Sequence, residues 1–280
     1  MSYLIKPLVA SIAMVSLLVL ASGCTKDRVL RLKDKEIIRW DQMIQEVKSS
    51  NIIFIGGLHE EPKHHKYQWR IIKGLYDQGL SIAVGLEMFQ ANEQPILDSW
   101  VAGHLPLDQL LDTYSVTWPE PSAHYKKIFL LAKDKKIPLI GLNVPPEIPR
   151  NVARKGFASL SEEEIRQLPP GSSCNVDETY MEFIKRVYSV RSSGKDFINF
   201  CEAQMVWDNA MALHVLKYLE KHPQVTIIIL SGTDRAWKRA TPRQIERLHA
   251  GHSVSVILPE YTAIEREIMT VDDTDFLLLR

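Results

Sequence analysis

Polar residues capable of chemistry follow three apolar stretches of the chain, at the point where each stretch ends. His59 and Glu60 follow IIFIGGL, Glu87 follows SIAVGL, and Asn143 follows IPLIGL. A histidine grouped with carboxylates and an amide can act as a general acid and base or bind a metal ion. A glutamate-rich helix N-terminus would explain the acidic residues without any chemistry. His64 and His65 are expected on the exposed first turns of the helix that follows.

A further set of polar residues lies on a long predicted helix around NFCEAQMVWDNAMALHVLKYL. Glu202 and Asn209 fall within an apolar stripe of this helix, and Asp208 lies at the edge of that stripe. Carboxylates are rarely buried without a partner. Glu202 therefore needs either a structural partner, such as a buried arginine or backbone amide, or the groups of a functional pocket.

Five short β-branched runs predict the strands that position these residues. They cover residues 52–55, 82–86, 138–142, 225–230 and 254–258. Segments with helical periodicity alternate with these runs, which predicts an α/β fold with a mostly parallel central sheet and helices on both faces. Ligands of such sheets bind at the carboxyl ends of the strands. His59, Glu87 and Asn143 are therefore expected at one edge of the sheet.

Two connections between the predicted strands are longer than a single crossover helix requires. Segments 90–135 and 145–200 carry helical patterns with Pro and Gly breaks, so we expect them to form a helical cap over one edge of the sheet. The α/β domain is expected to span residues 45–260. A tether at 24–44, which includes the start of the first helix, would precede it, and a tail at 261–280 would follow.

The first 24 residues, MSYLIKPLVASIAMVSLLVLASGC, are typical of a lipoprotein signal peptide. The apolar run is shorter than the roughly 20 residues that a membrane span needs. Residues 1–23 would be removed, and Cys24 would carry palmitate and other acyl chains that anchor the protein stably to a lipid bilayer. This predicts a cell-envelope protein on a bacterial membrane, the outer rather than the inner one. An ordinary signal peptide with an incidental cysteine is the alternative.

The charge balance gives no indication of a nucleic-acid partner. Loss of Lys6 with the signal peptide reduces the 34 Lys and Arg residues to 33, against 34 Asp and Glu. No bulk field therefore attracts polyanions. Cys174 and Cys201 could form one disulfide in an oxidising compartment, but two cysteines do not make a disulfide framework.

The sequence contains none of the motifs that define a reaction class by themselves. Cys-x-x-Cys, His-Glu-x-x-His, Gly-x-Ser-x-Gly and a phosphate-binding glycine loop are all missing from it. Spacing alone therefore does not identify a reaction.

Four stretches together with the lipobox resemble the ChaN-like haem-binding lipoprotein family, a branch of the Tiki and erythromycin-esterase-like superfamily. They are IIFIGGLHEEPKHHKYQ, VGLEMFQANEQPILDSW, HYKKIFLLAKDKKIPLIGLNVP and FCEAQMVWDNAMA, all within residues 45–250. The resemblance implies an α/β core with a helical cap, haem as the ligand, a homodimer that forms with haem binding, and a role in haem or iron acquisition.

Two departures from the family pattern argue against hydrolysis. Relatives usually carry Gly-Glu-x-His-Asp where this chain has GGLHE at 56–60, and Gly-x-Gly-His where it has SGTDRAW at 231–237. The chain therefore lacks a glutamate and the second histidine of the hydrolytic site of the superfamily. This favours a non-enzymatic binding protein.

A metal-dependent hydrolase is the alternative that the residues leave open. It would use His59, Glu87 and Glu202, with Asp234 in place of the missing histidine, because aspartate can bind zinc or manganese. A lipoprotein that only docks a partner and keeps its pocket empty is a third hypothesis.

Haem requires an axial side chain, an apolar slot and cations for its propionates. Tyr125, beside His124, aligns with a tyrosine that is common in relatives and is the first predicted ligand. Tyr180 and Tyr188, close in sequence to Arg186, form a second candidate set. Each of these aromatic residues could instead be a packing residue.

Overall fold

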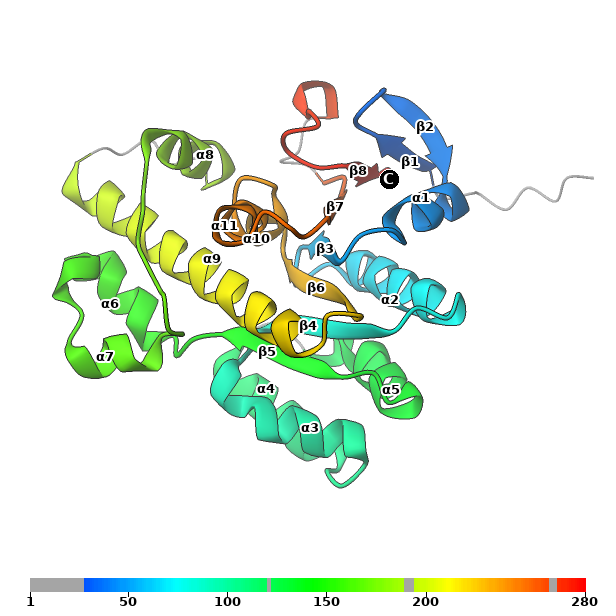
Figure 1. Cartoon of the computed structure of the whole chain (residues 1–280), viewed down its shortest axis with the longest axis horizontal. Helices are drawn as coiled ribbons and strands as arrows, with labels where there is room; N and C mark the ends of the chain where they lie inside the picture. Colours follow the sequence, from blue (N-terminus) through cyan, green and yellow to red (C-terminus); the bar gives the residue numbers. More distant parts are fainter. Residues whose placement is uncertain (1–27, 120–121, 189–193, 262–265) are drawn as a thin grey trace, which may run out of the picture.

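A mixed sheet runs through the centre of the protein, with strand order β2-β1-β8-β7-β3-β6-β4-β5 (Figure 1). The computed structural model describes residues 28–119, 122–188, 194–261 and 266–280. The predicted signal peptide and Cys24 lie outside the described residues.

The five predicted strands are all present. They are β3 (Ile52–Gly57), β4 (Ile82–Gln90), β5 (Leu139–Asn143), β6 (Thr226–Gly232) and β7 (Val254–Pro259). They pair in parallel, as expected for apolar runs that are buried on both faces. The predicted α/β fold with a mostly parallel sheet and helices on both faces is confirmed.

Three further strands lie in segments that the sequence assigned to a tether and a tail. They are β1 (Arg28–Arg31), β2 (Glu36–Arg39) and β8 (Phe276–Leu278). β1 pairs antiparallel with both β2 and β8, and β8 pairs in parallel with β7. The domain therefore extends beyond the predicted limits of 45–260 at both ends. These strands have only three or four residues, so their pairing depends on partners distant in sequence rather than on a local pattern.

One face of the sheet is covered by the helices that come first in the chain. They are α1 (Trp40–Val47), α2 (Pro62–Asp77), α3 (Gln94–Ala102), α4 (Leu107–Thr117) and α5 (Lys126–Lys135). Their buried side chains form one core with alternate strand residues such as Ile53 and Ile55. The first long insertion is helical as predicted, but it packs into this layer rather than forming a cap over the edge.

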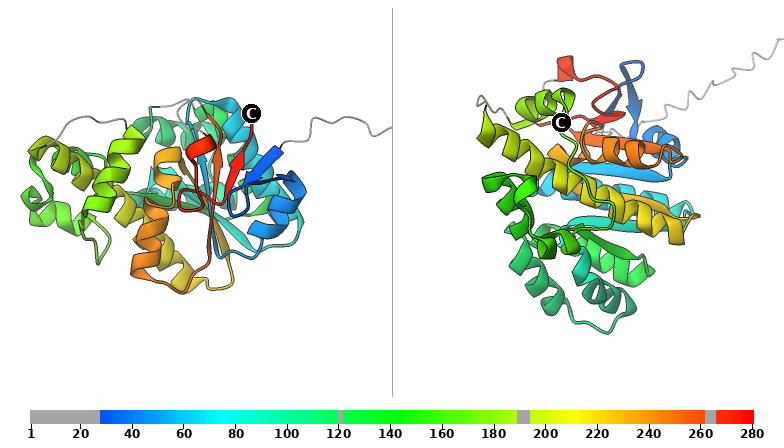
Figure 2. Two further views of the ribbon diagram at one scale, coloured as in Figure 1. Left: turned by 90° about the horizontal axis from the view of Figure 1, so that it is seen from above. Right: turned by 60° about the vertical axis from the view of Figure 1, so that its left-hand side comes forward.

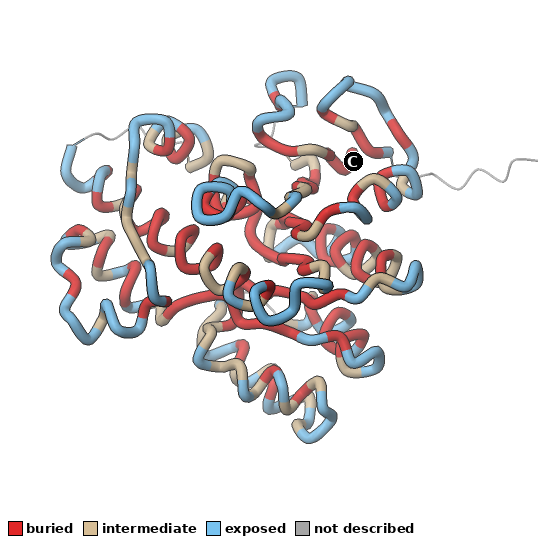
Figure 3. The backbone as a smooth tube through the Cα atoms, viewed as in Figure 1, coloured by how far each residue is buried: buried red, intermediate tan, exposed pale blue. Residues whose placement is uncertain are grey.

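The opposite face is covered by the later helices, chiefly α8 (Glu178–Tyr188), α9 (Lys195–Lys221), α10 (Thr233–Ala236) and α11 (Thr241–Leu248). They pack against the other alternate strand residues, including Ile52 and Phe54. Figure 3 shows buried backbone along the sheet and on the inner side of α9.

The second insertion extends to one side of the sheet (Figure 2). Its helices α6 (Glu147–Lys155) and α7 (Glu162–Gln167) share a small third core with α9, built around Ile148 and Val206. Short 3-10 turns complete the secondary structure: η1 (Ala91–Glu93), η2 (Ser122–His124), η3 (Phe157–Ser159) and η4 (Arg266–Ile268).

Within the described residues, every helix is too short or too polar to cross a bilayer. Cys174 and Cys201 are both free thiols. Burial raises the pKa of Cys174 to about 12 and that of Cys201 to about 11, so both thiols stay protonated at neutral pH.

The connections of neighbouring strands leave the sheet toward opposite faces at its carboxyl edge. β3 and β4 lead into helices on the first face, whereas β6, which lies between them, leads to α10 and α11 on the second. β5, beside β4, also leads to the second face. Such switch points leave crevices at the carboxyl ends of the strands, where open α/β sheets bind ligands.

The C-terminal strand should contribute to stability as a core element. Leu277 is fully buried between the sheet and the later helices, so Leu277→Ala should lower the free energy of unfolding by about 2–5 kcal/mol. Urea denaturation followed by circular dichroism measures this change. Leu248→Ala, at a position 40% exposed, is the control and should change stability by less than about 0.5 kcal/mol. Equal effects of the two substitutions would mean that residues 276–278 form no part of the core.

Candidate functional site

His59 lies in the crevice between β3, β4 and β6, as predicted. It follows β3 directly, and its side chain is 15% exposed. Nδ1 lies 2.6 Å from the hydroxyl of Tyr125, and the ring packs edge-on against Trp118 with 4.9 Å between centroids. Nε2 lies 3.8 Å from Oε2 of Glu87. The imidazole is therefore held from both sides.

Glu87 occupies an irregular part of β4, where the pairing with β5 shifts register between Leu86 and Gln90. Such irregularities re-aim side chains near functional sites. The carboxylate accepts a hydrogen bond from the backbone N–H of Gly232 at 2.7 Å. A Cβ atom on Gly232 would lie 2.4 Å from Oδ1 of Asp234, so any side chain at this position would require the Asp234 carboxylate to move.

Asn143 completes the predicted convergence of residues from three strands. Its Nδ2 donates to the backbone carbonyl of Glu87 at 2.9 Å, and its Oδ1 accepts from the N–H of Val144 at 2.8 Å. The side chain thus fixes the end of β5 to the irregular part of β4. The sequence predicted where Asn143 lies. In the structure its side chain hydrogen-bonds only to backbone groups, those of Glu87 and Val144, among the contacts described.

A buried arginine that the sequence did not predict lies at the centre of the site. Nε of Arg235, on α10, is 3.7 Å from Glu87, and Nη1 is 3.5 Å from Asp208. The guanidinium also donates to the backbone carbonyl of Gln204 at 3.3 Å and lies 4.8 Å from the ring centroid of Trp207. Arg235 is 5% exposed, so its charge is balanced by protein groups rather than by solvent.

Two of the predicted haem ligands belong to this same cluster. Tyr180 donates its hydroxyl to Asp208 at 2.5 Å. The hydroxyl of Tyr188 donates to Gln204 at 2.9 Å and also contacts the carboxylate of Asp234. Burial raises the pKa of both tyrosines well above the ordinary value. Both phenols therefore keep their protons in this arrangement.

One guanidinium faces three carboxylates, those of Glu87, Asp208 and Asp234, so the cluster retains a proton. Burial, reinforced by the charge of Asp234, raises the pKa of Glu87 to about 8, and burial also raises the pKa of Asp208. Asp208 accepts hydrogen bonds from Tyr180 and from Thr241, the latter at 2.8 Å. Because Asp208 has these two hydroxyl donors, we assign the retained proton to Glu87.

Two predicted pocket residues lie apart from this cluster. Glu60 is exposed to solvent. Glu202 directs Oε2 to the backbone N–H of Phe157 at 2.7 Å, which is the structural alternative that the sequence left open.

The predicted exposure of His64 and His65 is wrong. They are 5% and 3% exposed, because the first turn of α2 packs back against the loop after β3. Nδ1 of His64 accepts from the N–H of Leu58 at 3.0 Å, and Nε2 of His65 donates to the carbonyl of His59 at 2.8 Å. Both histidines therefore fix the loop that carries His59. His124 is half-buried and stacks on His65.

Three residues of the hydrolase hypothesis lie together, because His59, Glu87 and Asp234 all surround Gly232. Glu202 lies apart from them and accepts a hydrogen bond from the backbone N–H of Phe157, while Asp234 also contacts Tyr188. Across the described residues, no group of three or more His, Cys, Asp and Glu side chains is arranged to hold a metal ion.

A slot of about 210 Å³ opens beside this cluster, at the carboxyl ends of β4 and β5. Its lining includes Met88, Trp118, Asn143, Val144, Arg150 and Trp207. Nε1 of Trp118 is buried and has no hydrogen-bond acceptor among the described residues. Aromatic walls and an arginine at an exposed rim fit a flat apolar ligand with acidic substituents.

A larger hollow of about 660 Å³ lies at the opposite, amino-terminal edge of the sheet. Leu213, Leu216 and Pro223 give it an apolar lining, and His249 and His252 stand beside each other with 4.6 Å between ring centroids. A hollow of about 540 Å³ near α11 is lined mainly by charged groups and does not suit an apolar ligand.

Residues 43–245 match the family described as haem-binding uptake proteins of the Tiki superfamily, ChaN. The chain belongs to this family. Haem is the ligand named for this family. No curated protein sequence matches the chain.

Two solved structures share the fold at low sequence identity. ChaN of Campylobacter jejuni, whose structure is described as cofacial haem binding, superposes with a TM-score of 0.69 at 18% identity, covering 91% of this chain and 96% of that one. An H289N mutant of the erythromycin esterase EreC gives a TM-score of 0.52 at 11% identity, covering 84% of this chain and 76% of that one. At these identities the likeness establishes the fold alone.

The protonated state of Glu87 should make stability depend on pH. Its folded-state pKa of about 8 exceeds the ordinary 4.5, so the folded protein holds a proton that the unfolded chain releases between these values. Stability from this group is therefore present below about pH 4.5 and is lost as the pH rises to about 8. Glu87→Gln keeps an acceptor for Gly232 and removes the ionisation, so the loss of stability with rising pH should become smaller.

Urea unfolding of both proteins at pH 5 and pH 8 measures this difference, because these two pH values span most of the interval between the ordinary and the raised pKa of Glu87. Glu60→Gln, at an exposed position, is the matched control and should behave like the wild type. Parallel losses in wild type and Glu87→Gln would show that Glu87 is already ionised at pH 5.

Proposed function

We propose that the protein is a lipid-anchored haem-binding protein of the bacterial cell envelope that takes part in haem or iron acquisition, with haem held between two copies of the chain. The match of residues 43–245 to the haem-binding family carries this proposal. The signal peptide and Cys24 supply the anchor, and the outer membrane is the proposed location.

The slot beside Trp118 is our proposed haem site. It lies at a switch point of the sheet, and its lining combines apolar and aromatic walls with Arg150, whose guanidinium suits a haem propionate. Sites that enclose a ligand of drug size or larger have volumes of about 300–1,000 Å³. The slot, at about 210 Å³, covers only part of a porphyrin.

A second copy of the chain would cover the remainder of the ligand. Cofacial binding, the arrangement named for the Campylobacter jejuni protein, brings haem faces together and suits a shallow slot on each protomer. We therefore infer that haem binding and dimerisation are linked in this protein. Linkage of this kind makes the apparent affinity for haem depend on protein concentration.

The axial ligand needs a donor atom that can reach the slot. Tyr125 is 1% exposed and its hydroxyl lies against His59, while Tyr180 and Tyr188 direct their hydroxyls into the Arg235 cluster. The ligand role predicted for these tyrosines stays a prediction. Among them, Tyr125 is nearest to the slot through its contact with His59, whose ring packs on Trp118.

Hemin titration of residues 25–280 should give a saturable shift of the Soret band. Trp118→Ala removes one wall of the slot and should weaken binding about tenfold or more, equivalent to about 1.4 kcal/mol. Sedimentation velocity should show that hemin converts monomer to dimer. Urea unfolding of the variant checks that its fold is retained.

Two controls locate the site. Ile198→Ala, at a position 45% exposed on α9, should leave the titration unchanged. His252→Ala alters the hollow at the amino-terminal edge and should also have no effect. Weakening by His252→Ala with normal binding by Trp118→Ala would move the site to that hollow, and absence of saturation in the wild type would contradict haem binding itself.

Absorption spectra of the hemin-loaded protein should identify the axial ligand. If a tyrosinate binds ferric iron, Tyr125→Phe should remove the high-spin phenolate bands, while Tyr180→Phe and Tyr188→Phe should retain them because their hydroxyls are committed to carboxylates. Bands that persist in all three variants would exclude these tyrosines as ligands.

A further inference from the structure

We propose that the sheet edge formed by the β1–β2 hairpin and η4 is a bilayer-facing surface that lies directly on the membrane. The inference rests on the proposed acylation of Cys24. It adds which side of the domain meets the lipid, and hence how the haem site is oriented in the envelope.

The covalent distance from the anchor to the folded domain is short. β1 begins at Arg28, so only residues 25–27 separate it from Cys24. Four Cα steps span at most about 14 Å, even when fully extended. An acylated cysteine in the lipid therefore keeps the start of β1 within about 14 Å of the bilayer boundary.

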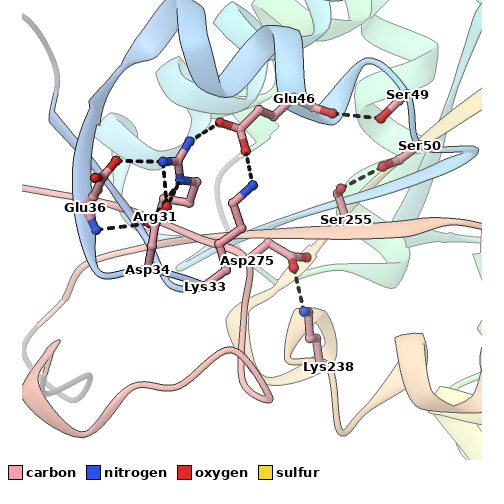
Figure 4. Close-up of polar contacts among 10 residues, drawn as sticks. All are labelled: Arg31, Lys33, Asp34, Glu36, Glu46, Ser49, Ser50, Lys238, Ser255 and Asp275. Carbon is pink, nitrogen blue, oxygen red and sulfur yellow. Dashed lines mark hydrogen bonds and ion pairs between the residues drawn. The ribbon is translucent and has the colours of Figure 1, made fainter.

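The attachment point cannot swing away from the domain, because β1 is a paired strand with charged links to α1 (Figure 4). Arg31 forms ion pairs with Asp34 at 2.6 Å and Glu36 at 2.8 Å within the hairpin, and with Glu46 of α1 at 2.5 Å. Lys33 adds a second link to Glu46 at 3.3 Å. The ladder to β8 supplies most of the rigidity, since exposed ion pairs contribute little individually.

The same edge presents large apolar side chains to solvent. Ile37 and Ile268 are 48% and 55% exposed. Ile37 is the register partner of Leu30, so it shares the face on which Leu30 packs with Met269, the residue after η4. The turn of the hairpin also contacts this segment, because Lys35 donates to the backbone carbonyl of Met269. Figures 1 and 3 show the exposed hairpin turn and η4 side by side.

The hairpin carries a small excess of cations. Residues 28–39 contain five cations, Arg28, Arg31, Lys33, Lys35 and Arg39, against two carboxylates. Asp41 and Glu46 of α1 pair with Arg39, Arg31 and Lys33, which leaves a net charge of +1 (five cations minus four carboxylates). The mature chain as a whole is nearly balanced, with 33 cations and 34 carboxylates once Lys6 is removed. Lys and Arg side chains near an anionic bilayer are attracted to its surface. Apolar side chains flanked by cations are the composition that interfacial segments use.

Orientation can be measured with tryptophan probes in the full chain, expressed with its signal peptide and reconstituted in vesicles of phosphatidylethanolamine and phosphatidylglycerol that contain brominated acyl chains. Ile37→Trp and Ile268→Trp should add fluorescence that bromine quenches. The control is Val116→Trp, at a position 86% exposed. Val116 belongs to α4, which Figure 1 shows at the opposite end of the molecule from the hairpin. After subtraction of the wild-type signal, quenching of the first two probes should exceed that of the control at least twofold.

The possible outcomes separate this inference from the proposed function. Mass spectrometry first establishes whether Cys24 is acylated. Acylated protein in which all three probes are quenched equally, or not at all, would overturn the bilayer-facing surface while leaving anchoring and haem binding intact. In detergent, the tryptophan at position 37 could instead become shielded from solvent as the protein concentration rises. That result would show that the exposed edge of β2 pairs with a second copy of the chain rather than with lipid. Unmodified Cys24 would overturn the anchor itself, whereas hemin titration would still test haem binding.

Discussion

The buried guanidinium of Arg235 is the interaction on which the arrangement of the site depends. It lies after β6 and contacts groups from β4 and α9, while two tyrosines of α8 donate hydroxyls to carboxylates of the same cluster. A buried charge is tolerated only when its partners stay in place, so the cluster fixes the second insertion against the sheet.

The chain shares its fold with an esterase and belongs to a haem-binding family. The crevice at the switch points still collects His59 and Glu87, but His59 contacts Tyr125, and Glu87 holds a proton beside a guanidinium. The apolar slot next to it keeps aromatic walls and an open rim, which are the features that a flat ligand needs.

Local patterns were sufficient to predict much of the framework. Near-continuous apolar runs are characteristic of strands buried on both faces, and parallel strands bring their carboxyl ends to one edge, so the meeting of His59, Glu87 and Asn143 followed from the sequence. The burial of His64 and His65 could not be predicted from the sequence, because no local pattern shows that the first turn of α2 packs against the loop that precedes it. One contact of this packing is the hydrogen bond from the backbone N–H of Leu58 to Nδ1 of His64.

By itself the sequence determined the order of the main strands and helices and the family, because these depend on residue type and spacing along the chain. Only the tertiary structure decided which polar groups became partners. Arg235 shares no pattern with Glu87 or Asp208, and β1 and β8 are short strands from opposite ends of the chain. Such contacts are selected by burial and charge balance in three dimensions, where residues more than 200 positions apart become neighbours.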